Sequence, residues 1–419
     1  HWNLHKRECD RTKKPIVSVY SEDCPYPVWH KDEWIRHAEP PGTDVNDTQE
    51  VFPHMWSFFQ QSAIPHNIGT GNQNCDYTDD WWHSKDCYLC HSGLNCEDDR
   101  YCYRVINLKN CQYCTFSFDC ELCTDLTNCR GCFNVRNAMN CINCNDSAFL
   151  YDCRGCSNCF LCANLRNKQF HFLNEPCAEE EYKRRVSEWD LRSRSVYERA
   201  KASFHRLLHE QAWHRALFSE QSEKSSGNYI ENCKESVNCY FTQDLEGCSN
   251  CWRAHNVRDC LDSVSPAFRC ELLYYTSLVQ EDCYDVKYSY NVVQSSWMEY
   301  CAHCFQCKHC FGCCGLVGKE YYIFNKPYSP QQYRAVRDHI LQHMRSTNEY
   351  GQFFPGYFAA QPYEESLSGF HWPLNQETLR QFGFRTNSRK QERSEHAHDV
   401  NDIPDHPEAV DNELSQRTF

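Results

Sequence analysis

The sequence lacks a long apolar run and an excess of positive charge. No stretch approaches the ~18 consecutive apolar residues that a membrane-spanning helix needs, so the composition excludes a transmembrane protein. Lysine and arginine total 43 against 57 aspartate and glutamate, a formal net charge of −14, which argues against a DNA clamp with a basic face. Full disorder is excluded too, because 33 Cys, 25 Tyr, 24 Phe and 11 Trp need a buried environment.

Recognisable catalytic motifs are also missing. The chain contains no glycine-rich phosphate loop, no GxSxG and no HExxH motif, so the common signatures of nucleotide-binding proteins, hydrolases and zinc proteases are absent. A cysteine nucleophile needs a neighbouring base, but among 33 Cys and 21 His a chance pairing carries no weight. No catalytic or cofactor-binding residue is predicted, and an enzyme of unknown class ranks third among the functions considered.

What the sequence does contain is cysteine at every third position. Between Cys87 and Leu165 every cysteine falls in one phase of a three-residue period, and Asp99 is the one charged residue in that phase. The cysteines are Cys87, Cys90, Cys96, Cys102, Cys111, Cys114, Cys120, Cys123, Cys129, Cys132, Cys141, Cys144, Cys153, Cys156, Cys159 and Cys162. Neither the 3.6-residue period of a helix nor the two-residue period of a flat strand produces this spacing.

The residue before each of these positions is most often Asn, Asp or Gly, the types that most readily adopt left-handed turn conformations. Each triplet therefore predicts a corner residue, a small inward residue and an outward residue. A chain that turns every three residues and buries one small side chain per side predicts a narrow β-solenoid with cysteine on its axis. Cysteines recur at steps of both nine and twelve residues. A twelve-residue coil is favoured, because a nine-residue coil leaves little room for Leu or Val.

The pattern returns in a shifted phase between Ile230 and Cys313, with an interruption at 266–280. Both arrays end alike. The segment 153–182 aligns without a gap with the segment 304–333, at a constant offset of 151 residues. This alignment indicates an internal duplication.

Helical patterns follow each array, where a helix laid over the open end would cover an unpaired strand edge. The predicted fold class is mainly β, with two tandem narrow cysteine-lined β-solenoids, each followed by capping α-helices. The predicted organisation is an N-terminal β-ribbon and aromatic segment (1–74), a first solenoid (75–177), a helical cap or linker (178–226), a second solenoid (227–328), a helix (329–346), an aromatic, turn-rich segment (347–384) and a flexible tail (385–419).

Unbroken CxxC runs make the ends of both arrays candidate metal sites. The candidate ligands are Cys153, Cys156, Cys159 and Cys162 in the first array and Cys301, Cys304, Cys307, Cys310 and Cys313 in the second. Four thiolates suit Zn²⁺, and Cu(I) and iron–sulfur clusters also favour thiolate. A three-residue repeat generates CxxC spacing by itself, so two alternatives stay open. The cysteines are structural filler, or they pair as disulfides in an oxidising compartment.

A second candidate metal site lies near the N-terminus, where His5, Cys9, Cys24 and His30 flank an expected hairpin. Four nitrogen and sulfur ligands could meet there as a half-degenerate zinc ribbon. The alternative is exposed histidine and unpaired cysteine. Histidines inside the arrays, including His303, occupy outward or corner positions, which predicts that they lie on the surface.

Seven segments carry a likeness to a known family: Leu4–Cys9, Ile16–Ser21, Asn74–Thr78, Asn143–Cys153, Cys162–Lys168, Tyr322–Ser329 and Glu349–Pro355. Over residues 1–384 the chain resembles a family of large, cysteine-rich, functionally uncharacterised proteins found mainly in candidate-phyla-radiation bacteria. Family members often carry zinc-ribbon-like CxxC pairs on both flanks. Those pairs are absent here, so the chain resembles a fragment or a trimmed relative. Some members have been labelled CoA-transferase-like, a chemistry that these residues do not support.

The sequence therefore predicts a non-enzymatic structural or interaction scaffold that binds zinc through cysteine thiolates, has a protein partner and does not associate with membranes. The alternative is a nucleic-acid- or ribosome-associated zinc-binding protein. The zinc ribbons of the family suggest this alternative, and the net charge of −14 opposes it. Basic residues between 182 and 206 offer a phosphate-contacting face, or else pair with the glutamates around them. The sequence does not fix the compartment; a cytoplasmic one, where thiols stay reduced, is favoured.

Overall fold

The fold is mixed α/β and is divided into two units. The computed structural model describes residues 3–69, 71–94, 96–97, 103–106, 115–118, 136–139, 146–234, 236, 239–243, 259–260, 272–273, 279–280, 290–293, 296–366, 368–369, 372–387 and 404–409. Unit 1 is His1–His66 with Arg215–Asn387, and unit 2 is Asn67–His214 with Ser388–Phe419. Helix and strand occur in comparable amounts, and the sheets are small. The prediction of a mainly β chain is corrected accordingly.

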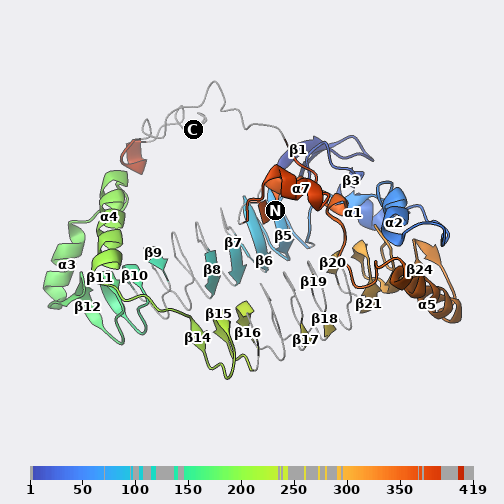
Figure 1. The fold of residues 1–419 in the computed structure, drawn as a ribbon. Coiled ribbons are helices and arrows are strands. Elements are labelled where there is room, and N and C mark those ends of the chain that lie inside the picture. The colour runs from blue at the N-terminus through green and yellow to red at the C-terminus, as the bar shows by residue number, and fades with distance from the viewer. Residues whose placement is uncertain are drawn as a thin grey trace. The chain divides into compact units, whose positions relative to one another are not determined.

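Unit 2 contains short parallel strands followed by two helices (Figure 1). Its elements are β5 (Thr78–Trp82), β6 (Cys90–Leu94), β7 (Tyr103–Ile106), β8 (Thr115–Phe118), β9 (Arg136–Met139), β10 (Ala148–Tyr151), β11 (Ser157–Ala163), β12 (Gln169–Phe172), β13 (Glu175–Pro176), α3 (Glu179–Ser187), α4 (Arg194–Glu210) and the 3-10 turn η4 (Pro407–Ala409). Paired residues of the parallel strands lie twelve apart, as Thr78 with Cys90 and Ala148 with Phe160. This offset equals the coil length that the sequence favours.

Left-handed backbone conformations recur at every third residue. From Asp146 to Leu173 the residues with positive φ are Asp146, Phe149, Asp152, Gly155, Asn158, Leu161, Asn164, Asn167, Phe170 and Leu173. They are the predicted corner positions, one residue before each inward position, so the prediction of a turn every three residues is confirmed for this segment. Phe, Leu and other bulky types seldom adopt positive φ, so strand pairing and packing hold them there against their own preference.

The interior of unit 2 also admits one large side chain. Trp81, in the same three-residue phase as Cys87 and Cys90, is fully buried in β5. Gly93 lies on the neighbouring strand, and a β-carbon built there would come within 2.1 Å of the Trp81 ring. The glycine therefore makes room for the indole, as large and small residues alternate in a narrow core.

The two helices of unit 2 pack on its last strands, α4 on β10 and β11 and α3 on β12 (Figure 1). The buried residues of α4 are Ala200, Phe204, Leu207 and Leu208, spaced so that they form one apolar stripe. Phe204 meets Phe149 edge to face at 5.8 Å. The helices predicted after the first array are confirmed, and they cover its final strands.

Unit 1 combines the N-terminal segment with the second array. Its elements are β1 (His5–Glu8), β2 (Pro15–Ser18), β3 (Val28–Trp29), α1 (Lys31–His37), α2 (Val51–Phe59), β4 (Ile64–Pro65), β14 (Ser219–Glu220), β15 (Gly227–Glu231), β16 (Cys239–Gln243), β17 (Asp259–Cys260), β18 (Leu272–Leu273), β19 (Val279–Gln280), β20 (Tyr290–Val293), β21 (Ser296–Glu299), β22 (Ala302–Phe305), β23 (Lys308–Phe311), β24 (Glu320–Ile323), β25 (Lys326–Pro327), α5 (Pro330–Ser346), η1 (Gly356–Phe358), η2 (Tyr363–Glu365) and α7 (Gln376–Gln381). The strands β21, β23 and β24 are parallel at an offset of twelve residues.

One hydrophobic core joins segments of unit 1 that lie far apart in the sequence. Its buried residues include Tyr20, Tyr26, Phe52, Met55, Phe58, Phe59, Tyr300, Phe311, Phe324, Tyr333, Ile340, Met344, Phe354 and Phe358. They come from the N-terminal segment, the last strands of the array, α5 and the turn-rich segment after it. Phe52 meets Tyr300 edge to face at 5.5 Å, and Phe59 meets Phe358 at 5.4 Å.

The helices of unit 1 begin at well-defined caps. Ser329 and Gln332 form a reciprocal capping box at α5, and Pro330 occupies its first turn. The helix α2 is capped from a distance. The buried Glu349 carboxylate accepts the backbone N–H groups of Val51 and Phe52 at 2.9 and 2.7 Å. An acidic group suits the positive end of a helix dipole, and this contact ties the N-terminal segment to the chain after α5.

The two arrays end in the same local structure. β13 pairs antiparallel with β12, and β25 pairs antiparallel with β24. Asn174 and Asn325, 151 residues apart, both have positive φ. Each donates its N–H to a cysteine sulfur, Cys162 at 3.4 Å and Cys313 at 3.5 Å. Each hairpin therefore covers the last parallel strand before a helix begins.

None of the helices in the described residues is long and apolar enough to cross a membrane.

The contact between Trp81 and Gly93 gives a first prediction. Gly93→Ala lowers the free energy of unfolding by about 1–3 kcal/mol, because the added methyl group overpacks the site that the indole fills. Urea denaturation measures the effect. In a Trp81→Phe background the same substitution costs less, because the smaller ring leaves space. An equal cost in both backgrounds would show that the ring does not cause the effect.

Candidate functional site

The cysteines of the first array that the sequence proposes as metal ligands line the interior of unit 2. Cys153, Cys156, Cys159 and Cys162 are at most 1% exposed. Each S–H donates to the carbonyl oxygen two residues earlier, at 3.3–3.5 Å. Three of them also reach the carbonyl nine residues later, at 3.5–3.8 Å. The thiols therefore serve as hydrogen-bond donors to the backbone that surrounds them.

The second array repeats this arrangement in unit 1. Its candidate ligands, Cys301, Cys304, Cys307, Cys310 and Cys313, are at most 2% exposed. All five thiols donate to the carbonyl two residues earlier, at 3.3–3.4 Å. Four of them also reach the carbonyl nine residues later, at 3.5–3.9 Å. A parallel strand ladder leaves a carbonyl lone pair unused, and the S–H group can occupy it.

Serine forms the same kind of hydrogen bond at other inward positions. Ser84 Oγ donates to the Trp82 carbonyl at 2.8 Å, and Ser236 Oγ donates to the Lys234 carbonyl at 3.1 Å. Both bonds run to the carbonyl two residues earlier, as the thiol bonds do. The inward position therefore selects a short side chain with a proton to donate.

Neighbouring thiols also contact one another. Cys153 and Cys159 donate toward Cys156, which lowers the pKa of Cys156 to about 3 and raises the pKa values of both donors. In the second array, hydrogen bonds from Cys304 and Cys310 lower the pKa of Cys307 to about 4. The cysteines of one row therefore differ in acidity.

Within the described residues, no three His, Cys, Asp or Glu side chains converge in an arrangement that would hold a metal ion. None of the cysteines whose side chains the structure describes forms a disulfide bond. The nine array cysteines are brought together as hydrogen-bonded rows, and their binding of zinc stays a prediction. Further array cysteines, including Cys111, Cys129, Cys251 and Cys283, lie outside the described residues.

The four N-terminal candidates each have a different environment. His5 lies 3.5 Å from the Glu365 carboxylate. Cys9 is buried and accepts the backbone N–H of His30 at 3.3 Å, whereas the His30 ring stacks on His66 with centroids 4.7 Å apart. Burial raises the pKa of Cys24 to about 11. His5 lies in β1, Cys9 directly follows that strand, and His30 precedes α1. A zinc ribbon there also stays a prediction.

Sequence reasoning missed one thiol pair, Cys75 and Cys87. They lie twelve residues apart in the same phase, beside the bridge between Gln73 and Lys85. A hydrogen bond from Cys87 lowers the pKa of Cys75 to about 7, and Cys75 is 7% exposed. Extending the three-residue phase upstream from Cys87 would have identified it.

His303 shows that an array position does not settle exposure. Its corner position predicts a surface residue, but it is 4% exposed and packs against the ring edges of Tyr20 and Tyr26 at 6.4 and 6.1 Å. Burial lowers the pKa of His303 to about 4. The prediction is wrong here because the N-terminal segment covers this corner.

The basic residues between 182 and 206 are largely paired. Lys183, Arg184 and Arg185 contact glutamates of α3 at 2.6–2.9 Å. Lys201 contacts Glu198 at 3.1 Å, and the Arg199 guanidinium lies 4.5 Å over the Trp189 ring. These contacts favour the interpretation of a salt-bridged surface over that of a phosphate-binding face.

Comparison of the chain with protein-family models, curated proteins and solved structures gives no match. The resemblance to the cysteine-rich bacterial family stays a prediction.

The Cys75–Cys87 contact gives a second prediction. Alkylation of Cys75 by iodoacetamide reaches half its maximal rate near pH 7 rather than near the ordinary thiol value of 9, because the thiolate is the nucleophile. Mass spectrometry of short labelling pulses measures the rate at each pH.

Two variants control this measurement. Cys87→Ala removes the donor and moves the midpoint of Cys75 labelling upward, whereas Cys87→Ser keeps a donor and leaves it low. The fully buried Cys314, whose pKa is raised by burial, stays unlabelled throughout. An unchanged midpoint in Cys87→Ala would contradict the assigned cause.

Proposed function

We propose that the protein is a non-enzymatic structural and interaction scaffold built on two cysteine-lined β-solenoids. The observation that carries the proposal is the row of buried thiols hydrogen-bonded to backbone carbonyls at a three-residue interval. In such rows the S–H groups donate hydrogen bonds to backbone carbonyls, so cysteine has a structural role there. The scaffold is proposed to present its outward side chains to a protein partner.

The solenoid is supported by two independent regularities. Corner residues such as Asp152 and Gly155 adopt left-handed conformations every three residues. Most of the described parallel strands of the arrays pair at an offset of twelve, and the offset is eleven between β14 and β15 and thirteen in the pairs β17–β18 and β19–β20. Four three-residue sides therefore separate one residue from its partner. Inward side chains repeat in register along such a coil, which explains why cysteine recurs in one phase.

Aromatic side chains at corner positions support the interaction role. In unit 1, Trp297, His309 and Tyr321 are twelve residues apart and stack with centroid distances of 4.7 and 4.8 Å. Trp297 is 42% exposed, and Tyr333 of α5 packs edge to face on Tyr321 at 5.8 Å. A rigid aromatic row with an exposed end suits protein contacts, where aromatic side chains supply much of the binding energy.

A nucleic-acid partner is the alternative function. It needs unpaired basic groups along one face, whereas Lys183, Arg184 and Arg185 are paired with glutamates, and the chain carries a net charge of −14. RNA binding that weakens steeply with salt would favour this alternative over the protein scaffold.

Elemental analysis with thiol counting tests the role of the cysteines. Protein purified under reducing, zinc-supplemented conditions is expected to contain well below one metal ion per chain. All 33 cysteines are expected to react with a thiol reagent after unfolding, and few before it, because the buried sulfurs are inaccessible to the reagent. Binding of one or more zinc ions per chain, abolished by Cys156→Ser, would contradict the structural role of the hydrogen-bonded rows. It would support the metal site predicted from the sequence.

A coil insertion tests the solenoid. A second copy of residues 82–93, inserted after Gly93, adds twelve residues and keeps every strand in register. This variant is expected to keep a cooperative unfolding transition in urea. The matched control repeats residues 88–93 alone and shifts the register by half a coil. It is expected to lose more than about 4 kcal/mol of unfolding free energy, beyond the range of ordinary substitutions. Equal effects of the two insertions would refute the solenoid.

A further inference from the structure

The N-terminus of α4 receives a second cap from a distant part of the chain. Within the helix, Ser193 Oγ accepts the N–H of Val196 at 3.3 Å. That bond leaves the first two amides of α4, those of Arg194 and Ser195, to be satisfied from outside the helix. Asp405 provides both acceptors, although it lies 210 residues after Ser195.

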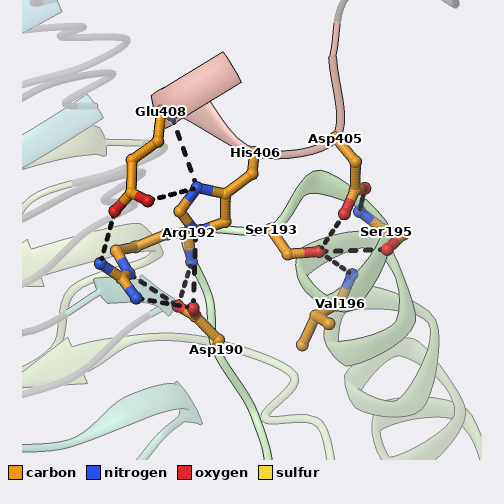
Figure 2. Close-up of polar contacts among 8 residues, drawn as sticks. All are labelled: Asp190, Arg192, Ser193, Ser195, Val196, Asp405, His406 and Glu408. Atoms are coloured by element: carbon orange, nitrogen blue, oxygen red, sulfur yellow. Dashed lines mark hydrogen bonds and ion pairs between the residues drawn. The ribbon is translucent and has the colours of Figure 1, made fainter.

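Asp405 contacts the helix through its backbone and its carboxylate (Figure 2). Its carbonyl oxygen accepts the N–H of Arg194 at 2.7 Å. Its Oδ1 accepts the N–H of Ser195 at 2.6 Å, and its Oδ2 accepts the Ser193 hydroxyl at 2.6 Å. These bonds lower the pKa of Asp405, because they favour the ionised carboxylate.

A second group of charges flanks this contact (Figure 2). Arg192 binds the Asp190 carboxylate through two nitrogens, at 2.9 and 2.8 Å. The same guanidinium donates to Glu408 at 3.3 Å. The His406 ring lies 3.5 Å from Asp190 and 3.8 Å from Glu408. Asp190 and Arg192, which precede α4, thus contact the side chains of His406 and Glu408.

We propose that the N-terminus of α4, together with Asp190 and Arg192, is a binding site for a short acidic peptide segment, and that residues 404–409 of this chain occupy it as a detachable clasp. The site takes a carboxylate on the first-turn amides, a second carboxylate on the guanidinium and an imidazole on Asp190. The outer ion pair is highly exposed, with Arg192 and Glu408 side chains 55% and 77% accessible. Salt screens such pairs, so the contact is reversible.

The clasp is distinct from the proposed scaffold role. Among the described residues, the contacts that form it involve no cysteine and no array strand. An external acidic segment with the same chemistry would compete with residues 404–409 for the same amides. The clasp therefore controls access to the site.

Amide hydrogen exchange of the full-length chain, resolved to single residues by mass spectrometric fragmentation, tests this site. The amides of Arg194 and Ser195 are expected to be protected, and Asp405→Ala is expected to speed their exchange at least tenfold. Glu198→Ala is the matched control. It removes an exposed carboxylate from the same helix, where Glu198 pairs with Lys201, and is expected to leave both rates unchanged.

A peptide added in trans separates a binding site from a merely structural contact. The synthetic peptide of residues 401–412, added to the Asp405→Ala chain, is expected to restore protection of Arg194 and Ser195. The same peptide with alanine at position 405 is expected to have no effect. Exchange of these amides at equal rates in the wild type and Asp405→Ala would overturn the clasp. Failure of the peptide to restore protection at millimolar concentration would overturn the binding site.

Discussion

The constraint on which the rest depends is the narrow interior formed by a backbone that turns every three residues. Each of the nine candidate array cysteines donates to a carbonyl oxygen of its own segment, and most of them also reach one nine residues on. A leucine side chain is accommodated at only some inward positions. A charged group there would be buried without water to solvate it. Cysteine and serine are short and carry a proton, so they fill the space and satisfy the carbonyls together. The bonds from Cys162 to the Phe160 and His171 carbonyls show both contacts.

The same winding creates the need for the helical parts. A stack of parallel strands leaves an open edge at its end, which would pair with other chains if it stayed exposed. In both units a two-residue antiparallel strand covers the last parallel strand, and a helix packs beside it. In unit 1 the N-terminal aromatic segment closes the same region, with Phe52 against Tyr300 and Phe58 against Phe324. Helix content is therefore a consequence of the strand architecture.

Burial and hydrogen bonding give the described thiols different reactivities. In unit 1, burial raises the pKa values of Cys301 and Cys304. These thiols therefore stay protonated and donate hydrogen bonds to backbone carbonyls. Near the start of the first array, Cys75 receives a hydrogen bond from Cys87 in a less buried place. The repeat places cysteine at many inward positions. The burial of each cysteine and its neighbours decide its acidity.

Much of the local structure follows from the sequence, because it depends on residues within one or two turns of the chain. The Asn, Asp and Gly positions identified the corners, the room needed by inward Leu and Val favoured the twelve-residue offset, and apolar spacing located α4 and α5. Three features needed the tertiary structure: the burial of His303 beneath Tyr20 and Tyr26, the Glu349 cap on α2, and the docking of Asp405 on α4. Each joins segments hundreds of residues apart, and no local pattern records which distant segment will cover a given surface. A repeat fixes its own geometry through short-range sterics, whereas the partners of its ends are chosen by long-range packing.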